Sequence, residues 1–233
     1  MIGEGGTKHM ETFRRFEKKY LLTENQYLML MDKLNSHIKQ DKFFESDIRS
    51  IYYDTDRFEL IRRSIEKPEY KEKLRVRSYH EASDDEPVFV ELKKKLDGIV
   101  YKRRTKAISR DVLNDIYECE FKDPQVGAEI RYALKYYGKL KPAVYIGCNR
   151  TSYVANDDKD LRITFDKDIR YRMKHLALKA SDHDKPVTDK IVMELKVRNA
   201  MPLWLTAILD EVKAYPRGFS KVGTAFLNEI RGD

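Results

Sequence analysis

Apolar and charged residues alternate in several short segments of the chain. In YKEKLRVRSYH, residues 70–80, Leu74 and Val76 separate the cations Lys73, Arg75 and Arg77. Successive side chains of a β-strand point to opposite faces, so a strand here places the two apolar residues on one face and the three cations on the other. Taken alone, such a strand is also compatible with a basic face that simply lies in water.

The alternation recurs in further segments, whose charged faces also carry mostly lysine and arginine. These segments are VFVELKKK (88–95), DLRITFDKDIR (160–170) and IVMELKVR (191–198). Solvated strand faces usually mix threonine, serine, lysine and glutamate, whereas Glu91 and Glu194 are isolated carboxylates among cations. A shared anionic ligand explains why several strands carry the same kind of face.

Hydrophobic periodicity, caps and turns predict about eight strands with helices inserted between them. The strands are expected at 12–22, 46–55, 70–80, 87–96, 99–108, 142–154, 160–170 and 190–198. The helices are expected at 23–38, 56–67, 109–118, 123–138, 202–213 and from near Ser220 onward. Thr23 and Gln26 form a capping box, and Asp97-Gly98 marks a hairpin turn between two strands.

These elements predict the α+β class, with an antiparallel β-barrel and helices packed around its outside. Eight strands can close into a barrel that holds one small ligand. The charged faces then line the lumen as a tunnel, and the apolar faces point outward to the helices. We expect residues 1–12 to be a disordered leader or tag and residues 13–233 to form a single domain.

Composition points to a polyanionic partner. Charged residues make up 36% of the chain and the formal net charge is +7, which is typical of proteins that bind nucleic acid, anionic membranes or phosphate-rich small molecules. No apolar run has the length of a membrane helix, and the two cysteines have no zinc or disulfide spacing. We therefore expect a cytoplasmic protein without a membrane segment of its own.

A series of short motifs in chain order resembles the VTC domain, the polyphosphate polymerase branch of the CYTH-like triphosphate tunnel metalloenzymes. The resemblance spans about residues 13–230. The motifs are FEKKY, IRSIYYDT, KLRVRSY, VELKKK, VYKRR, NRTSYV, LRITFD, MELKV and FSKVGTA.

The resemblance implies an eight-stranded triphosphate tunnel that binds ATP and inorganic polyphosphate. In that family the γ-phosphoryl group of ATP is transferred to a growing polyphosphate chain with the help of Mn2+ or Mg2+. A membrane protein is an implied partner of the family, and no nucleic acid is expected. The oligomeric state, the primer and the direction of product exit stay open.

The resemblance also implies roles for individual residues, and the strand pattern adds Lys73 to them. The residues expected to act on the transferred phosphoryl group are Arg75, Arg77, Lys93, Arg150 and Lys221. The other substrate-binding residues are Lys19, Lys73, Lys102, Arg162, Lys196 and Ser220. Glu194 matches the metal-binding glutamate, with Glu17, Glu91 and Asp166 as alternatives. Glu17 and Glu91 are equally compatible with a role as ion-pair partners of lysines.

The first motif departs from the hydrolytic members of the superfamily, which carry E-x-E-x-K on the first strand. The corresponding residues here are Arg15, Glu17 and Lys19. Loss of a carboxylate removes a metal ligand, and hydrolytic sites favour several carboxylates, so the sequence favours a polymerase. A triphosphatase of the same fold and a non-catalytic polyphosphate-binding module are the alternatives.

Other polar residues are assigned to structural roles. Asp54 is expected to cap a helix, and tyrosines such as Tyr52 to belong to the barrel wall. Strand alternation directs Lys18, Lys94 and Arg103 away from the lumen. The histidines have no metal-ligand spacing and are given no role in the chemistry.

Overall fold

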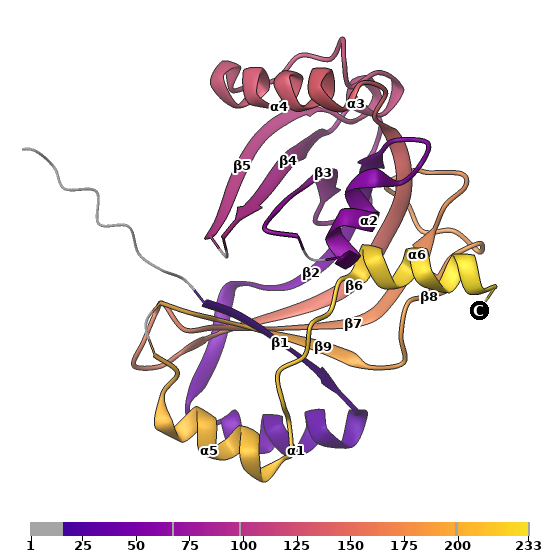
Figure 1. Ribbon diagram of the computed structural model, residues 1–233. Coiled ribbons are helices and arrows are strands. Elements are labelled where there is room, and N and C mark those ends of the chain that lie inside the picture. Colours follow the sequence, from indigo (N-terminus) through magenta and orange to yellow (C-terminus); the bar gives the residue numbers. More distant parts are fainter. Residues whose placement is uncertain (1–15, 67, 98, 199, 233) are drawn as a thin grey trace, which may run out of the picture.

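The computed structural model describes residues 16–66, 68–97, 99–198 and 200–232 (Figure 1). The predicted leader at 1–12, the first-strand Arg15 and the hairpin Gly98 lie outside the described residues. All strands of the described part belong to one sheet. We propose on this basis that residues 13–233 form one domain.

The sheet is antiparallel, which confirms the predicted α+β class. Its strand order is β1-β9-β7-β6-β2-β3-β4-β5, with the short β8 paired to β7. The strands are β1 (Phe16–Leu22), β2 (Ile38–Asp54), β3 (Tyr70–Ser78), β4 (Pro87–Leu96), β5 (Ile99–Ile108), β6 (Lys141–Ala155), β7 (Arg162–Arg172), β8 (Lys185–Pro186) and β9 (Ile191–Val197). The long strands β2 and β6 connect the β3-β4-β5 half to the β1-β9-β7 half, and the two halves lie above and below each other in Figure 1.

The sheet is not closed into a barrel, which corrects one part of the prediction. β1 and β5 end the strand order, and no pairing joins them in the described residues. The two halves approach through side chains instead, because Lys93 Nζ of β4 lies 3.6 Å from Glu17 Oε2 of β1. The cations of the two halves also act on each other across this space: burial is the largest cause that lowers the pKa of Lys73, and the charges of Lys19 from the other half and of Lys93 lower it further. The fold is therefore tunnel-like without backbone closure, and we call the space between the two halves the lumen.

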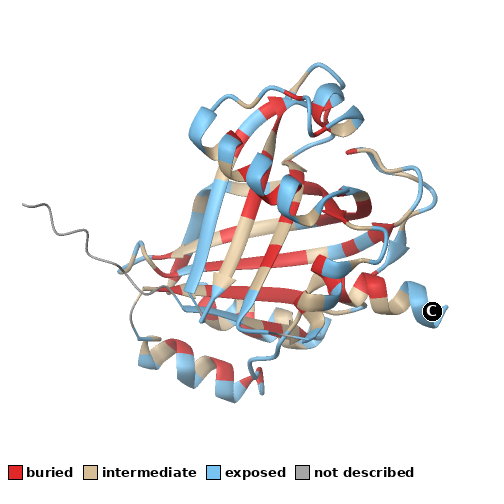
Figure 2. Cartoon of the chain, turned by 45° about the horizontal axis from the view of Figure 1, so that its top comes forward, coloured by how far each residue is buried: buried red, intermediate tan, exposed pale blue. Residues whose placement is uncertain are grey.

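Helices cover the outer face of each half, as the alternating pattern predicts. Leu74, Val90 and Leu92 pack with residues of α4 (Pro124–Tyr137), beside the short α3 (Ser109–Asn114). On the other half, Met193 and Leu195 pack with α1 (Glu24–Leu34) and α5 (Leu203–Glu211). Figure 2 shows buried bands along the strands, and in β3 buried and intermediate residues alternate from Lys71 onward. The apolar residues that alternate with the cations along the strands thus form the outer core.

One end of the lumen is filled by helices, which differs from the prediction that all helices lie outside. α6 (Lys221–Arg231), next to α2 (Glu59–Glu66), inserts Val222 and Phe226 among Ile146 of β6 and Val192 of β9. The inner face of β6 is apolar around Ile146, so it requires cover from water. The lumen therefore has an apolar end under α6 and a charged end beyond it.

The predicted helix ends are largely confirmed. The Thr23–Gln26 capping box is present, and Ser220 Oγ accepts the backbone N–H of Gly223 at the start of α6. Asp54 accepts the N–H groups of Leu60 and Ile61, so it caps α2 from β2. Three boundaries differ most: α1 ends at Leu34 rather than near 38, α3 ends at Asn114 rather than near 118, and β2 starts at Ile38 rather than near 46.

No helix within the described part of the chain combines the length and apolar character needed to cross a bilayer.

Candidate functional site

The strand register gathers most of the predicted site residues in the lumen. On the upper half, Lys73 lies opposite Lys93, Lys93 opposite Lys102, and Arg75 opposite Glu91. On the lower half, Lys19 lies opposite Glu194, and Lys196 opposite Glu17. Residues directly opposite each other in a ladder share a face of the sheet. The predicted cationic faces of separate strands thus become the two walls of one space.

Glu91 holds the cations of the upper wall together. Its side chain is 1% exposed, and Arg75 Nε donates to Oε2 at 2.7 Å. Lys102 Nζ lies 2.7 Å from Oε1, and Arg104 Nε donates to the same oxygen at 2.6 Å. Burial opposes ionisation of Glu91, but the surrounding cations outweigh it and lower its pKa. Glu91 is therefore a charged organiser of this wall, which favours the ion-pair alternative over the metal-ligand one.

Arg104 is a lumen residue that the sequence analysis missed. It follows Lys102 by two positions and so shares its face, and its guanidinium also stacks on Phe89 with 4.3 Å to the ring centroid. The period-two alternation that identified Lys102 was the signal for Arg104 as well. Lys94 and Arg103 take the opposite face, as predicted, where they pair with Glu72 and with Glu129 of α4.

Asp166 organises the inner part of the lower wall. Its side chain is fully buried and accepts two hydrogen bonds from Arg150, at 2.6 and 2.7 Å. Lys221, the first residue of α6, forms an ion pair with the same carboxylate. Burial disfavours the charged form, but Lys221 and Arg150 lower the pKa of Asp166. The last family motif therefore reaches the same lumen as Arg150, and Asp166 balances charge there.

Glu194 and Glu17 lie between lysines near the open end. Glu194 Oε1 is 2.8 Å from Lys196 Nζ, and Oε2 is 4.0 Å from Lys19 Nζ, which is also 3.7 Å from Glu17 Oε1. Thr164 lies opposite Glu194 in the sheet, and its buried hydroxyl oxygen has no hydrogen-bond partner within the described structure. No group of three or more potential metal ligands occurs in the described ranges. A metal at this place would be held by Glu194 or Glu17 together with oxygen atoms of a ligand.

Lys73 and Arg77 differ from the other central cations because no described carboxylate lies within ion-pair distance of either. Lys73 Nζ donates to Ser220 Oγ at 3.0 Å, and Arg77 Nε donates to Ser50 Oγ at 3.0 Å. Burial is the largest cause that lowers the pKa of Lys73 to about 8 and that of Arg77 below its ordinary value. Cations that are partly removed from water without an anionic partner are costly, so these two define a place prepared for an anion.

Tyr52 is a second lumen residue that the sequence analysis did not assign to the site. It lies opposite Arg75 in the sheet, and its hydroxyl oxygen accepts a hydrogen bond from Arg75 Nη1 at 2.9 Å. Burial raises the pKa of the phenol, but Arg75, Arg77 and Lys73 outweigh this and lower it to about 7. Tyr53 faces the outer core, so the neighbouring tyrosines have opposite roles.

We expect Tyr52 to titrate near neutral pH in the folded protein. The native tyrosinate absorbance should rise in a step near pH 7, because the lumen cations stabilise the phenolate. The pKa of Tyr52 is lower in the folded state than in the unfolded state, so its contribution to stability is fully present above its ordinary pKa of 10.0. This contribution decreases as pH falls from 10.0 and is lost as pH falls through about 7. Ultraviolet titration of the protein and of Tyr52→Phe checks this. Identical absorbance curves would contradict the assignment.

Arg162 lies apart from the central cluster. It is opposite Lys196 in the ladder, but its guanidinium forms an ion pair with Asp41 of β2. Every other predicted site residue takes part in the contacts described above, so the structure brings most of the set together in the lumen. The roles of these residues in binding or catalysis stay predictions.

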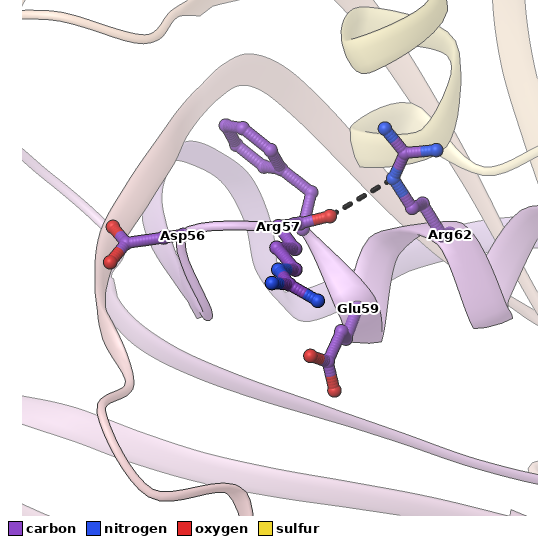
Figure 3. Close-up of a pocket in the computed structure, with 5 residues that line it drawn as sticks. Asp56, Arg57, Glu59 and Arg62 are labelled. Carbon is purple, nitrogen blue, oxygen red and sulfur yellow. Dashed lines mark hydrogen bonds between the residues drawn. The ribbon is translucent and has the colours of Figure 1, made fainter.

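A separate hollow of about 630 Å3 lies at the start of α2 and is lined by Asp56, Arg57, Phe58, Glu59 and Arg62 (Figure 3). Arg62 Nε donates to the carbonyl oxygen of Arg57 at 2.9 Å there. None of the predicted site residues lines it. The chemistry-bearing residues are in the lumen.

Comparison with known proteins identifies the family and the fold. A family model described as the VTC domain matches residues 14–228. The solved structure of a "putative adenylate cyclase" from Bacillus halodurans aligns with a TM-score of 0.53 and 13% identity, covering 88% of this chain and 92% of that chain. A protein of the same description from Vibrio parahaemolyticus aligns with a TM-score of 0.46 and 12% identity, covering 89% and 94%. The search of curated proteins found no match. The likeness to the Bacillus protein shows a shared fold.

Proposed function

The chain belongs to the VTC domain family, a branch of the triphosphate tunnel proteins, and from this premise we propose that it is an ATP-dependent polyphosphate polymerase. The reaction transfers the γ-phosphoryl group of ATP to the terminal phosphate of an inorganic polyphosphate chain. The products are ADP and a chain longer by one phosphate. ATP and polyphosphate are the proposed partners, and a cytoplasmic location fits the use of ATP.

The observation that carries this proposal is the pair of cations, Lys73 and Arg77, that face the lumen without a described carboxylate partner. A triphosphate supplies closely spaced negative oxygens, and guanidinium and ammonium groups bind such oxygens by charge-assisted hydrogen bonds. The neighbouring Arg75, Arg150 and Lys221 are already oriented by Glu91 and Asp166. The ligand therefore meets a preorganised cationic site.

Phosphoryl transfer depends on positioning and on neutralising charge spread over the equatorial oxygens. Arg75, Arg77, Lys93, Arg150 and Lys221 are proposed to contact the transferred group. Lys19, Lys73, Lys102, Arg162, Lys196 and Ser220 are proposed to hold the rest of the ligand. A chain-end phosphate oxygen attacks the γ-phosphorus in line, and the oxygen shared with the β-phosphate leaves with ADP.

The lumen carboxylates favour transfer to phosphate over transfer to water. The buried carboxylates Glu91 and Asp166 are engaged by partly buried cations, and Glu17 contacts Lys19 and Lys93. A hydrolase needs carboxylates that hold metals or orient a water molecule. These three carboxylates are therefore less available for that task than Glu194, whose Oε2 lies 4.0 Å from Lys19 Nζ.

Glu194 is the proposed metal ligand, with Mn2+ or Mg2+ as the cation. The Glu194 carboxylate and the unpartnered Thr164 hydroxyl are hard oxygen donors side by side on the lumen face. Mg2+ is commonly held by one or two carboxylates together with substrate phosphates, so these residues fit the group. When bound, the cation supplies further charge neutralisation of phosphate oxygens.

Incubation of the pure protein with ATP and Mn2+ or Mg2+ tests the proposed function. Resolution of the products on a gel should give a ladder of polyphosphate chains, and Lys73→Ala should remove it. Release of ADP and inorganic phosphate without a ladder would identify a triphosphatase. Binding of polyphosphate without consumption of ATP would identify a binding module. Either result contradicts the proposal.

Glu194→Ala should reduce metal-dependent turnover by about a hundredfold or more, because it removes the proposed carboxylate anchor of the cation. Glu194→Ala should still bind tripolyphosphate without metal, because the Glu194 carboxylate no longer competes with phosphate for Lys19 and Lys196. Turnover and calorimetric binding measure the two effects. Retained turnover in Glu194→Ala combined with loss in Glu17→Ala would move the metal site to β1.

A further inference from the structure

A basic hollow of about 420 Å3 continues the lumen face beyond Lys196. It lies where the first part of β2 meets the end of β6 and the start of β7. The described residues that line it are Lys39, Gln40, Asp41, Lys42, Val154, Lys159 and Arg162. Apart from Arg162, none of these belongs to the proposed catalytic or substrate-binding set.

The strand register joins this hollow to the lumen. Lys39 lies opposite Val154, Val154 opposite Arg162, and Arg162 opposite Lys196. Opposed residues share a face of the sheet, so Lys39 and Arg162 are on the same face as Lys196 and, two residues further along β9, Glu194. The row crosses the open end of the lower wall, away from the apolar end under α6.

The charge of the hollow favours an anion. Lys39, Lys42 and Lys159 are all exposed. Asp41 is the carboxylate among the described lining residues, and it is occupied by Arg162. The three lysines therefore present ammonium groups that Asp41 does not neutralise. The lining residues include no aromatic side chain on which a nucleobase would stack.

We propose that this hollow is an accessory binding site for inorganic polyphosphate, which holds the part of a long chain that extends out of the lumen past Lys196. The inference rests on the proposed function and adds a path for the chain. Ammonium groups bind phosphate oxygens as point charges without base recognition, which suits a uniform phosphate polymer. A ligand as short as tripolyphosphate occupies the central cations and does not reach Lys39, Lys42 and Lys159.

Comparison of a short and a long ligand tests the accessory site. The variant combines Lys39→Ala, Lys42→Ala and Lys159→Ala, and the control combines Lys122→Ala, Lys135→Ala and Lys139→Ala, which removes the same charge from exposed positions around α4. Binding of tripolyphosphate and of long-chain polyphosphate is measured by calorimetry at several salt concentrations. Since each exposed charge pair contributes modestly, we expect the variant to lose about tenfold in affinity for the long chain and less than about twofold for tripolyphosphate. Its affinity for the long chain should also depend less on salt.

Three outcomes overturn the inference. The first is an equal loss of affinity for both ligands in the variant, and the second is a loss of long-chain affinity in the control as large as that in the variant. The third is tighter binding of single-stranded RNA than of polyphosphate of similar charge at the hollow. Failure of the proposed function gives a different result, because wild-type protein then shows no ladder or no effect of Lys73→Ala on tripolyphosphate binding. A ladder with unchanged long-chain affinity in the variant rejects the accessory site alone.

Discussion

Glu91→Gln should lower the free energy of unfolding of the ligand-free protein by about 1.5–3 kcal/mol, because partly exposed cations lose the buried carboxylate that they share. Arg75, Lys102 and Arg104 all depend on this one group, and its side chain is only 1% exposed. Denaturant titration measures the loss. Glu129→Gln is the control, since Glu129 pairs with Arg103 on the outer surface and such a pair is worth about 1 kcal/mol or less.

The pH dependence and the ligand dependence of this loss follow from the same contacts. The pKa of Glu91 is lower in the folded state, so its contribution is present above its ordinary value of 4.5 and is lost as pH falls toward the lowered pKa. The difference between wild type and Glu91→Gln should therefore shrink in acid. Saturating tripolyphosphate should also reduce it, because phosphate oxygens replace the missing carboxylate. If the difference in free energy of unfolding between wild type and Glu91→Gln changes neither with pH nor with tripolyphosphate, Glu91 does not organise the cations as described.

In contrast to Glu91→Gln, Arg77→Met should weaken ligand binding without lowering the stability of the ligand-free protein. We expect affinity for tripolyphosphate to fall by about 10- to 150-fold, the range that corresponds to a charged hydrogen bond of about 1.5–3 kcal/mol. The ligand-free protein should keep its free energy of unfolding or gain some, because burial already lowers the pKa of Arg77 and no described carboxylate pairs with it. Calorimetric binding and denaturant titration measure the two quantities.

Arg103→Met is the matched control for Arg77→Met, since it removes an arginine whose partner, Glu129, lies on the outer face. It should leave the affinity for tripolyphosphate nearly unchanged. If both variants weaken binding equally, net charge explains the effect. If Arg77→Met destabilises the free protein by several kcal/mol with no loss of affinity, Arg77 is a structural residue.

The faces of the strands were predictable from the sequence because alternation has a fixed period. Leu74 and Val76 had to be buried together, and this fixed the direction of Lys73, Arg75 and Arg77. The caps at Thr23 and Ser220 depend on local residues alone, so they were also predictable.

Closure and the filled end of the lumen were not predictable in the same way. Closure depends on whether β1 and β5, which are far apart in the sequence, pair with each other, and the alternation within a single strand does not predict that pairing. The insertion of α6 depends on the apolar inner residues of β6, such as Ile146, whose partners are distant in sequence. Neither feature produces a periodic pattern in the local sequence.

The partners within the site also needed the three-dimensional structure. The sequence placed Glu91 and Asp166 among the metal-ligand alternatives, but it did not show that each carboxylate is enclosed by cations from other strands or from α6. Tyr52 was assigned to the barrel wall because it lies on a predicted strand, as does its neighbour Tyr53. Only the register, which sets Tyr52 opposite Arg75, separates the two.

A crystal structure of the protein with tripolyphosphate tests the central claim, that the lumen is a triphosphate site built around cations without carboxylate partners. We predict phosphate density between the two halves of the sheet, with oxygen atoms hydrogen-bonded to Lys73 and Arg77 and further contacts from Arg75, Arg150 or Lys221. Ordered phosphate found only on the outer surface, with Lys73 and Arg77 free of contact, would contradict the account.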